Sequence, residues 1–357
     1  MAFRSEPFGW LIEMQTDSEH DLFCFFGAAD YFKMPLTQMF LQNSSFDVEV
    51  RPRVDEMVAN IKEALHDSIR KATWLDEATR RNALRKAEAL EYSVGYPENL
   101  FNDTFHREQY NITPSNSSEH FYAFLARVFR QQTTARLAQY ELVVARMGFD
   151  VASPVIPNAY YSSNLNKMFL HMGSMQLPYF SPNLPDYVNY AGLGTTVGHE
   201  LMHAFGIKAR SYDHDGIKRN WWSNDSVTKY DSKMECFVKQ YDGYGIDGRQ
   251  TLEENMADNV GLMLAYNAYK KKHSKHPGYV ESALPGLEKL TLDQIFFITA
   301  ASTSCALDPS TGLNPNSPYT PEKLRIFGPL QNMKELSVAF NCSKDSNMNP
   351  KNRCSVW

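Results

Sequence analysis

Apolar residues recur every three or four positions through residues 51–92, and this spacing predicts two amphipathic helices there. The same pattern predicts a helix over residues 121–147. The stretch between them, residues 96–118, is rich in asparagine and contains glycine and proline, a composition typical of a surface connection. The first 150 residues are therefore expected to be mainly helical.

The pattern changes beyond residue 150. Residues 155–161 and 167–172 have the composition of short β-strands, and a helix is predicted over residues 187–207. Further helices are expected over residues 221–240, 251–272 and 290–302. The tail beyond residue 307 is predicted to consist of loops with one short helix near residues 333–340. These elements predict a mainly α-helical protein with a small mixed β-sheet, divided near residue 150.

Composition and charge exclude two classes of partner. The chain has 357 residues with 36 basic and 41 acidic side chains, and it contains no basic tract, so nucleic acid is not expected as a partner. No stretch approaches the roughly 18 consecutive apolar residues of a membrane span. The first 25 residues also lack the basic start and apolar run of a secretory signal.

Other features point to an extracellular protein. Asn-x-Ser/Thr sequences, the acceptor sites for N-glycosylation, begin at Asn43, Asn102, Asn111, Asn116, Asn224 and Asn341. The five cysteines have no CxxC metal spacing, and from the residues alone they are either buried thiols or disulfide partners. The odd cysteine count and the missing signal have one common explanation, namely that this chain is the C-terminal part of a longer secreted protein.

One helix carries the motif that suggests chemistry. His199 and His203 stand four residues apart in the predicted helix 187–207, about 40° apart around its axis. Their imidazoles can therefore bind one zinc ion, while Glu200 points beside the metal and can accept a proton from its water. A helix can carry these residues by chance, but the apolar neighbours Val197 and Leu201 favour a metal site, because unpaired polar groups would be costly there.

A catalytic zinc ion needs a third protein ligand and one open position. Downstream, Glu254 and Asp258 are four residues apart on another predicted helix, so one carboxylate can bind the metal while the other supports a ligand histidine. The alternative is a capping box, in which Thr251 and Glu254 begin the helix. The upstream histidines favour the metal interpretation.

Five motifs together resemble the C-terminal half of a neprilysin-type zinc metalloendopeptidase, the family that includes the endothelin-converting enzymes. The motifs are Asn158-Ala159-Tyr160-Tyr161, Gly198-His199-Glu200-Leu201-Met202-His203, Glu254-Asn255-Met256-Ala257-Asp258-Asn259, Leu324-Arg325-Ile326-Phe327-Gly328 and Cys354-Ser355-Val356-Trp357. The resemblance extends over residues 46–357. It implies a zincin (thermolysin-like) catalytic domain at residues 151–357, with residues 1–150 forming part of a helical lobe and a connection.

The resemblance also implies roles for single residues. His199, His203 and Glu254 are similar to the ligands of one zinc ion per chain, and Glu200 to the base that activates water. Asp258 is similar to the carboxylate that orients the first histidine.

Three further residues resemble the substrate-binding groups of the family. Asn158 and Ala159 match the edge-strand residues that hold the backbone of an oligopeptide substrate. Arg325 matches the arginine that binds a substrate carbonyl, although by itself it could equally form a surface salt bridge.

The family's compartment and disulfides carry over as expectations. Its members are extracellular, glycosylated and disulfide-bonded, and many have one N-terminal membrane helix, which a missing N-terminal part of this protein could carry. By the family pattern Cys236 pairs with Cys354. Cys24, Cys305 and Cys342 would pair with upstream cysteines that this chain lacks.

Some positions depart from the family pattern. Asn316 stands where the resemblance suggests a histidine that stabilises the transition-state oxyanion. Thr303 and Ser304 replace a Val-Trp pair of the specificity pocket, and Gly206 replaces an acidic residue soon after the second histidine.

Two functions therefore remain open. The first is a zinc endopeptidase that hydrolyses oligopeptides with Glu200 as general base. The second is a non-catalytic or weakly active zinc-binding homologue that captures peptides or partners, which the departures favour and the intact Glu200 opposes. An aminopeptidase would require a G-x-M-E-N type motif, which the sequence lacks.

Overall fold

The computed structural model describes residues 21, 25–27, 29, 31–42, 46–102, 119–138, 153–275, 281–305 and 317–357. The chain divides into two compact units. One comprises Met1–Ser44 with Tyr96–Ile156, and the other comprises Ser45–Gly95 with Pro157–Trp357. Residues 45–95 thus group with the C-terminal part of the chain, whereas the sequence placed them in a lobe with the rest of the first 150 residues.

The described part of the first unit includes the α-helices α2 (Lys33–Gln42) and α6 (Phe121–Ala138) and a short 3₁₀-helix, η2 (Glu98–Phe101). Gln38 of α2 donates a hydrogen bond from Nε2 to the carbonyl of Leu100 at 2.8 Å, which ties α2 to η2. The helix predicted for residues 121–147 is confirmed up to Ala138, and its last predicted residues lie outside the described part.

A three-stranded mixed sheet forms in the second unit. Its order is β1 (Glu91–Gly95), β3 (Lys167–His171), β2 (Ala159–Ser162), with β1 parallel and β2 antiparallel to the central β3. The predicted strands β2 and β3 are confirmed, but β1 was missed because its residues continue an amphipathic helical pattern. Only the distant partner β3 supplies the hydrogen bonds that make this segment a strand.

The second unit is otherwise helical. Its α-helices are α3 (Arg51–Lys71), α4 (Glu77–Ala89), α8 (Asp186–Asn189), α9 (Thr195–His203), α10 (Asn224–Asp242), α11 (Leu252–Lys275), α12 (Leu292–Ser302), α13 (Glu322–Asn332) and α14 (Lys334–Ala339). The helix predicted over residues 187–207 is shorter, and a π-helical turn at Tyr190–Gly194 separates α8 from α9. The prediction of loops over residues 322–332 was wrong, because α13 forms there although Pro329 lies inside it.

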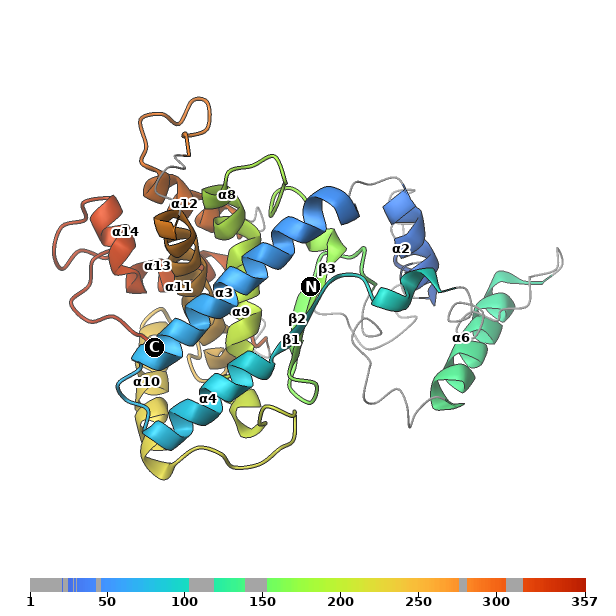
Figure 1. Cartoon of the computed structure of the whole chain (residues 1–357), viewed down its shortest axis with the longest axis horizontal. Helices are drawn as coiled ribbons and strands as arrows, with labels where there is room; N and C mark the ends of the chain where they lie inside the picture. Colours follow the sequence, from blue (N-terminus) through green and yellow to red (C-terminus); the bar gives the residue numbers. More distant parts are fainter. Residues whose placement is uncertain are drawn as a thin grey trace. The chain divides into compact units, whose positions relative to one another are not determined.

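Helix α11 is the centre of this unit. Helices α3, α9, α10 and α13 all pack against it, and Figure 1 shows α3 crossing α9 and α11. Because α11 is covered on several sides, its buried residues do not form a single apolar stripe. In α3, by contrast, the buried side chains follow the predicted spacing: Val54, Met57, Ile61, Leu65 and Ile69. No helix in the described ranges is long and apolar enough to cross a membrane.

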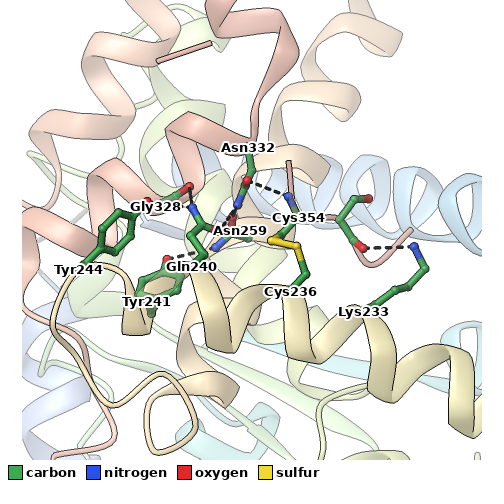
Figure 2. The surroundings of a disulfide bond; sticks show 10 residues. Lys233, Cys236, Gln240, Tyr241, Tyr244, Asn259, Gly328, Asn332 and Cys354 are labelled. Atoms are coloured by element: carbon green, nitrogen blue, oxygen red, sulfur yellow. Dashed lines mark hydrogen bonds between the residues drawn. A yellow bond between two sulfur atoms is a disulfide. The ribbon is translucent and has the colours of Figure 1, made fainter. Parts of the chain in front are cut away.

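The C-terminal tail is fastened to the helices by the group that we call the tail clamp, namely Cys236, Asn259, Asn332 and Cys354. Cys236 of α10 forms a disulfide with Cys354, as the resemblance predicted. Figure 2 shows Asn332 of α13 beside it, donating to Asn259 Oδ1 at 2.6 Å and accepting from the Cys354 N–H at 2.9 Å. The clamp therefore joins α10, α11 and α13 to the chain terminus.

The structure describes two of the three other cysteines. Cys305 is exposed and Cys342 is partly exposed, and each is a free thiol with respect to the described residues. Cys24 lies outside the described residues.

Candidate metal and peptide site

Helices α9 and α11 cross in direct backbone contact. A Cβ atom added to Gly198 would lie 2.5 Å from the carbonyl oxygen of Gly261, and one added to Gly261 would lie 2.6 Å from the amide nitrogen of His199. Side chains at these positions would force the helices apart. The two glycines therefore allow the carboxylates of α11 to reach the histidines of α9.

Three donor atoms converge at this crossing. His199 Nε2 lies 3.0 Å from His203 Nε2 and 3.2 Å from Glu254 Oε2, and His203 Nε2 lies 3.8 Å from the same oxygen. Ligands that bind zinc tetrahedrally at about 2.0–2.1 Å lie about 3.3 Å from one another. The donor set and its spacing therefore fit a zinc ion. The Glu254 carboxylate faces His199, as the metal interpretation of this residue requires.

An ion-pair network supports His199 from behind. Its Nδ1 lies 2.8 Å from Asp258 Oδ1, and Asp258 receives two hydrogen bonds of 2.7 Å from the Nε and Nη2 of Arg325 on α13. Burial opposes the charged form of Asp258, but Arg325 outweighs it and lowers the pKa of this carboxyl to about 2. Burial likewise opposes the imidazolium, but Asp258 and Glu254 raise the pKa of His199 to about 10. The carboxylate and the arginine thus hold the imidazole in one orientation.

Glu200 lies beside the histidines. A ligand atom from each of His199, Glu200 and His203 falls within 4.8 Å of the others. The Glu200 residue is only 6% exposed, and burial raises the pKa of its carboxyl above the ordinary range. A carboxylate that binds protons more readily than usual is suited to general-base chemistry.

A cavity of about 540 Å³ opens next to these groups, and His199, Glu200, Asp258 and Arg325 line it. The rest of its wall comes from other segments of the same unit, including Asn158, Ala159, Thr303, Ser304, Cys305 and Tyr319. The structure thus brings the predicted metal ligands, Glu200, Asp258 and the predicted substrate-binding residues to one cavity or its border, since His203 and Glu254 contact His199 directly.

Asn158 and Ala159 lie where β2 begins, at the edge of the sheet. Within the described strands β2 pairs with β3 alone and therefore forms one edge of the described sheet. Two hydrogen bonds to its backbone hold Asn158 in place. Its carbonyl accepts from the His171 N–H at 3.0 Å and from the Ser174 hydroxyl at 3.1 Å. The edge is therefore fixed in place beside the cavity.

Comparison with known proteins decides the family. A sequence profile described as Peptidase family M13 matches residues 158–356, and a second profile with the same description matches residues 4–97. The chain belongs to peptidase family M13. The neprilysin-type resemblance inferred from the five motifs is thereby confirmed.

Relatives of this M13 chain are longer than it is. Endothelin-converting enzyme 1 of Rattus norvegicus is 33% identical over 352 residues, which cover 94% of this chain and 44% of the relative. Neprilysin-21 of Caenorhabditis elegans is 33% identical over 340 residues, which cover 91% and 43%. The crystal structure of PEPO from Lactobacillus rhamnosis HN001 matches with a TM-score of 0.75 at 26% identity, covering 92% of this chain and 50% of that one. The mainly helical fold with a small mixed sheet is thus confirmed, in a chain that spans less than half the length of these curated relatives.

Two residues of the site were missed from the sequence. Tyr319 lines the cavity, and the guanidinium carbon of Arg325 lies 5.2 Å from the centre of its ring. Glu253 contacts His203 from the side opposite Glu254. Tyr319 lies only six positions before Arg325, and Glu253 is adjacent to Glu254, so proximity to a motif was the available signal. Asn316, the residue predicted to take the place of the oxyanion histidine, lies outside the described residues.

The segment that carries Tyr319 is anchored to the start of α11. The buried Thr320 hydroxyl donates to Asn255 Oδ1 at 2.6 Å, and Gln250 Nε2 donates to the Ser317 carbonyl at 2.8 Å. Asn255 is the neighbour of Glu254 in the chain, so these bonds hold Tyr319 near the ligand cluster.

Proposed function

We propose that this chain is a zinc-dependent endopeptidase that hydrolyses peptide bonds of oligopeptides. The observation that carries the proposal is the convergence of two imidazole nitrogens and one carboxylate oxygen, with Glu200 beside them, on a cavity bordered by a sheet edge. His199, His203 and Glu254 would hold the ion. When bound, zinc supplies a Lewis acid that lowers the pKa of a water molecule and polarises the scissile carbonyl.

The chain's own residues move the proton. Glu200 accepts it from the attacking water and then delivers it to the leaving amine, so its buried carboxyl acts first as base and then as acid. Asp258 keeps the Nδ1 of His199 hydrogen-bonded, which leaves Nε2 free for the metal. Arg325 in turn keeps Asp258 in place.

The peptide is held as an added strand. Asn158 and Ala159 at the edge of β2 hydrogen-bond its backbone, the mode of recognition that suits an extended oligopeptide. Arg325 is not an isolated surface residue, because two of its nitrogens bind Asp258, whose side chain is only 12% exposed. Its remaining nitrogen, Nη1, binds a substrate carbonyl.

Tyr319 supplies a second hydrogen-bond donor to the oxyanion. Its ring lies against Arg325, and its segment is anchored beside Glu254. Partial desolvation raises the pKa of this phenol further above neutral pH, so the hydroxyl is protonated and able to donate. Tyr319 rather than Asn316 would then take the part of the histidine that the family pattern suggests.

We further propose that the protein acts outside the cell as a glycosylated ectodomain. The Cys236–Cys354 disulfide suits an oxidising compartment. The sequon asparagines that the structure describes are all exposed: Asn102, Asn224 and Asn341.

A non-catalytic, peptide-capturing homologue is the second candidate, because Thr303 and Ser304 line the cavity and make the proposed specificity pocket more polar. The deciding experiment assays the purified chain with internally quenched peptides carrying either a hydrophobic or a polar residue after the cleaved bond. Zinc-loaded wild type should cleave and a chelator should stop it. Failure of the zinc-loaded protein to turn over any peptide would favour the second candidate.

Two variants locate the chemistry. Glu200→Gln should lower kcat by about 10²–10⁴-fold while the protein still binds zinc, because only the proton acceptor is lost. Glu235→Gln on the exposed face of α10 is the matched control and should retain full activity. His203→Ala should lose stoichiometric zinc in metal analysis, and retention of the ion would refute the ligand assignment.

A further inference from the structure

Two consecutive glutamates contact opposite nitrogens of one imidazole. Glu254 Oε2 lies 3.8 Å from His203 Nε2, whereas Glu253 Oε1 lies 3.8 Å from His203 Nδ1. The side chains of His203 and Glu253 are each only 18% exposed, so water competes weakly for this contact. His203 thus has a carboxylate near its Nδ1, as His199 has Asp258 near its own Nδ1.

The Glu253 carboxylate occupies space that a glycine leaves open. A Cβ atom added to Gly206 would lie 1.9 Å from Glu253 Oε1, so no side chain fits at position 206 while Glu253 adopts this conformation. Gly206 is also the position at which the sequence departs from the family pattern by lacking an acidic residue. The segment after α9 therefore lacks an acidic side chain at position 206, and Glu253 of α11 places a carboxylate in the same space.

The second carboxylate oxygen holds the side chain in place. Glu253 Oε2 accepts a hydrogen bond from the Ile207 N–H at 2.9 Å, just beyond the end of α9. This bond by itself is a structural role, since a backbone N–H in a connecting segment needs an acceptor. That bond uses only Oε2, however, and it leaves Oε1 directed toward His203.

We propose that Glu253 is a positioning residue for His203, and that Gly206 is the substitution that makes room for it. The Glu253 carboxylate faces Nδ1 of His203, which favours the tautomer that carries its proton on Nδ1 and presents Nε2 to the metal. The separation of 3.8 Å is about 0.8 Å longer than an ordinary hydrogen bond, so in this structure Glu253 is a close electrostatic partner of His203. This inference rests on the proposed zinc site.

The test measures the zinc dissociation constant by competition with a coloured chelator. Glu253→Gln should weaken zinc binding about 10- to 100-fold, because a carboxylate behind a ligand histidine contributes that much to metal affinity. Glu235→Gln, an exposed glutamate of α10, is the control and should stay within about twofold of wild type. The melting temperature of the metal-free protein separates the two roles, since a residue that only caps the chain after α9 would change that temperature and leave affinity intact.

Exchanging the two positions provides the sharper readout. Gly206→Asp alone should weaken zinc binding, because its side chain collides with Glu253. The double variant Gly206→Asp with Glu253→Gly should bind zinc within about threefold of wild type, because the carboxylate returns from the other segment. Such a rescue supports the proposal even if Glu253→Gln lowers stability.

The outcomes separate this inference from the proposed function. Wild-type protein that binds no zinc would overturn both. Tight zinc binding by wild type together with unchanged affinity in Glu253→Gln would overturn only the role of Glu253. Failure of the double variant to regain affinity over Glu253→Gln would also refute the exchange.

Discussion

The helix crossing and the tail clamp share α11 and α13 but are held by different interactions. At the crossing, α9 and α11 touch through Gly198 and Gly261, and partly buried polar contacts connect His199 to Asp258 and Asp258 to Arg325. At the tail clamp, the Cys236–Cys354 disulfide and the Asn332 amide join segments distant in the sequence (Figure 2). The crossing positions donor atoms, whereas the clamp keeps helices together. The two regions should therefore respond differently to substitution.

The largest effect is expected from opening the disulfide. Replacing Cys236 and Cys354 together by serine should lower the free energy of unfolding by about 2–5 kcal/mol, because the bond closes a loop between residues separated by 118 positions. Zinc affinity of the folded fraction should change less than about threefold. Denaturant unfolding and chelator competition measure the two quantities, with Cys342→Ser as control. A loss of affinity as large as that of Glu253→Gln would show that the clamp and the crossing are not separable.

Removal of one hydroxyl should affect catalysis alone. Tyr319→Phe should lower kcat/KM by about 10²-fold, because it removes a donor to the oxyanion. Zinc affinity and melting temperature should not change. Tyr122→Phe in the other unit is the control, since both tyrosines are 52% exposed. Full activity of Tyr319→Phe would contradict the role of Tyr319 as an oxyanion donor. Arg325 would then be the remaining proposed donor to the substrate carbonyl.

A methyl group at the crossing should disturb both stability and the site. In Gly261→Ala the new Cβ meets the backbone at His199 N and at Thr195 O, 2.6 and 2.8 Å away. Overpacking of this kind costs about 1–3 kcal/mol. Because α9 must shift, its ligand histidines would also move. Zinc affinity should therefore fall by roughly tenfold, as it does when a group that orients a metal ligand is lost. Gly194→Ala, whose new Cβ would make only ordinary contacts with side-chain atoms, the nearest at 3.4 Å, should have little effect in thermal unfolding and zinc titration.

The smallest effect concerns a cap that lies outside both regions. Asp76 begins α4 and accepts hydrogen bonds from the Ala78 and Thr79 amides at 3.0 Å and from the Ser226 hydroxyl at 2.6 Å. Hydrogen bonds from Ser223 and Ser226 are the main reason why the pKa of Asp76 is lowered. Asp76→Ala should cost about 1–2 kcal/mol at neutral pH and leave zinc binding unchanged.

The pH dependence of this variant follows from the sign of the shift. The carboxyl has a lower pKa in the folded than in the unfolded chain, so its contribution is present above about pH 4 and is lost as the pH falls further. The difference in unfolding free energy between wild type and Asp76→Ala should therefore narrow below about pH 4. A difference independent of pH would show that the charge of Asp76 contributes nothing.

Local sequence patterns correctly predicted the elements that show a regular repeat of buried residues. The spacing of Val54, Ile61 and Ile69 was enough for α3, because each turn repeats the same buried face. Strand β1 and helix α13 were missed for the opposite reason. The first exists through its pairing with β3, and the second forms around Pro329, which locally disfavours a helix.

By itself the sequence determined that His199, Glu200 and His203 share one helix, because the relation between positions four apart is set by helix geometry. It also identified the family through the order of its motifs. It left Glu254 as either ligand or cap, and it said nothing of Glu253. Only the tertiary structure decided which carboxylate faces which nitrogen, because that depends on how closely Gly198 and Gly261 let two helices approach, and no local pattern encodes that distance.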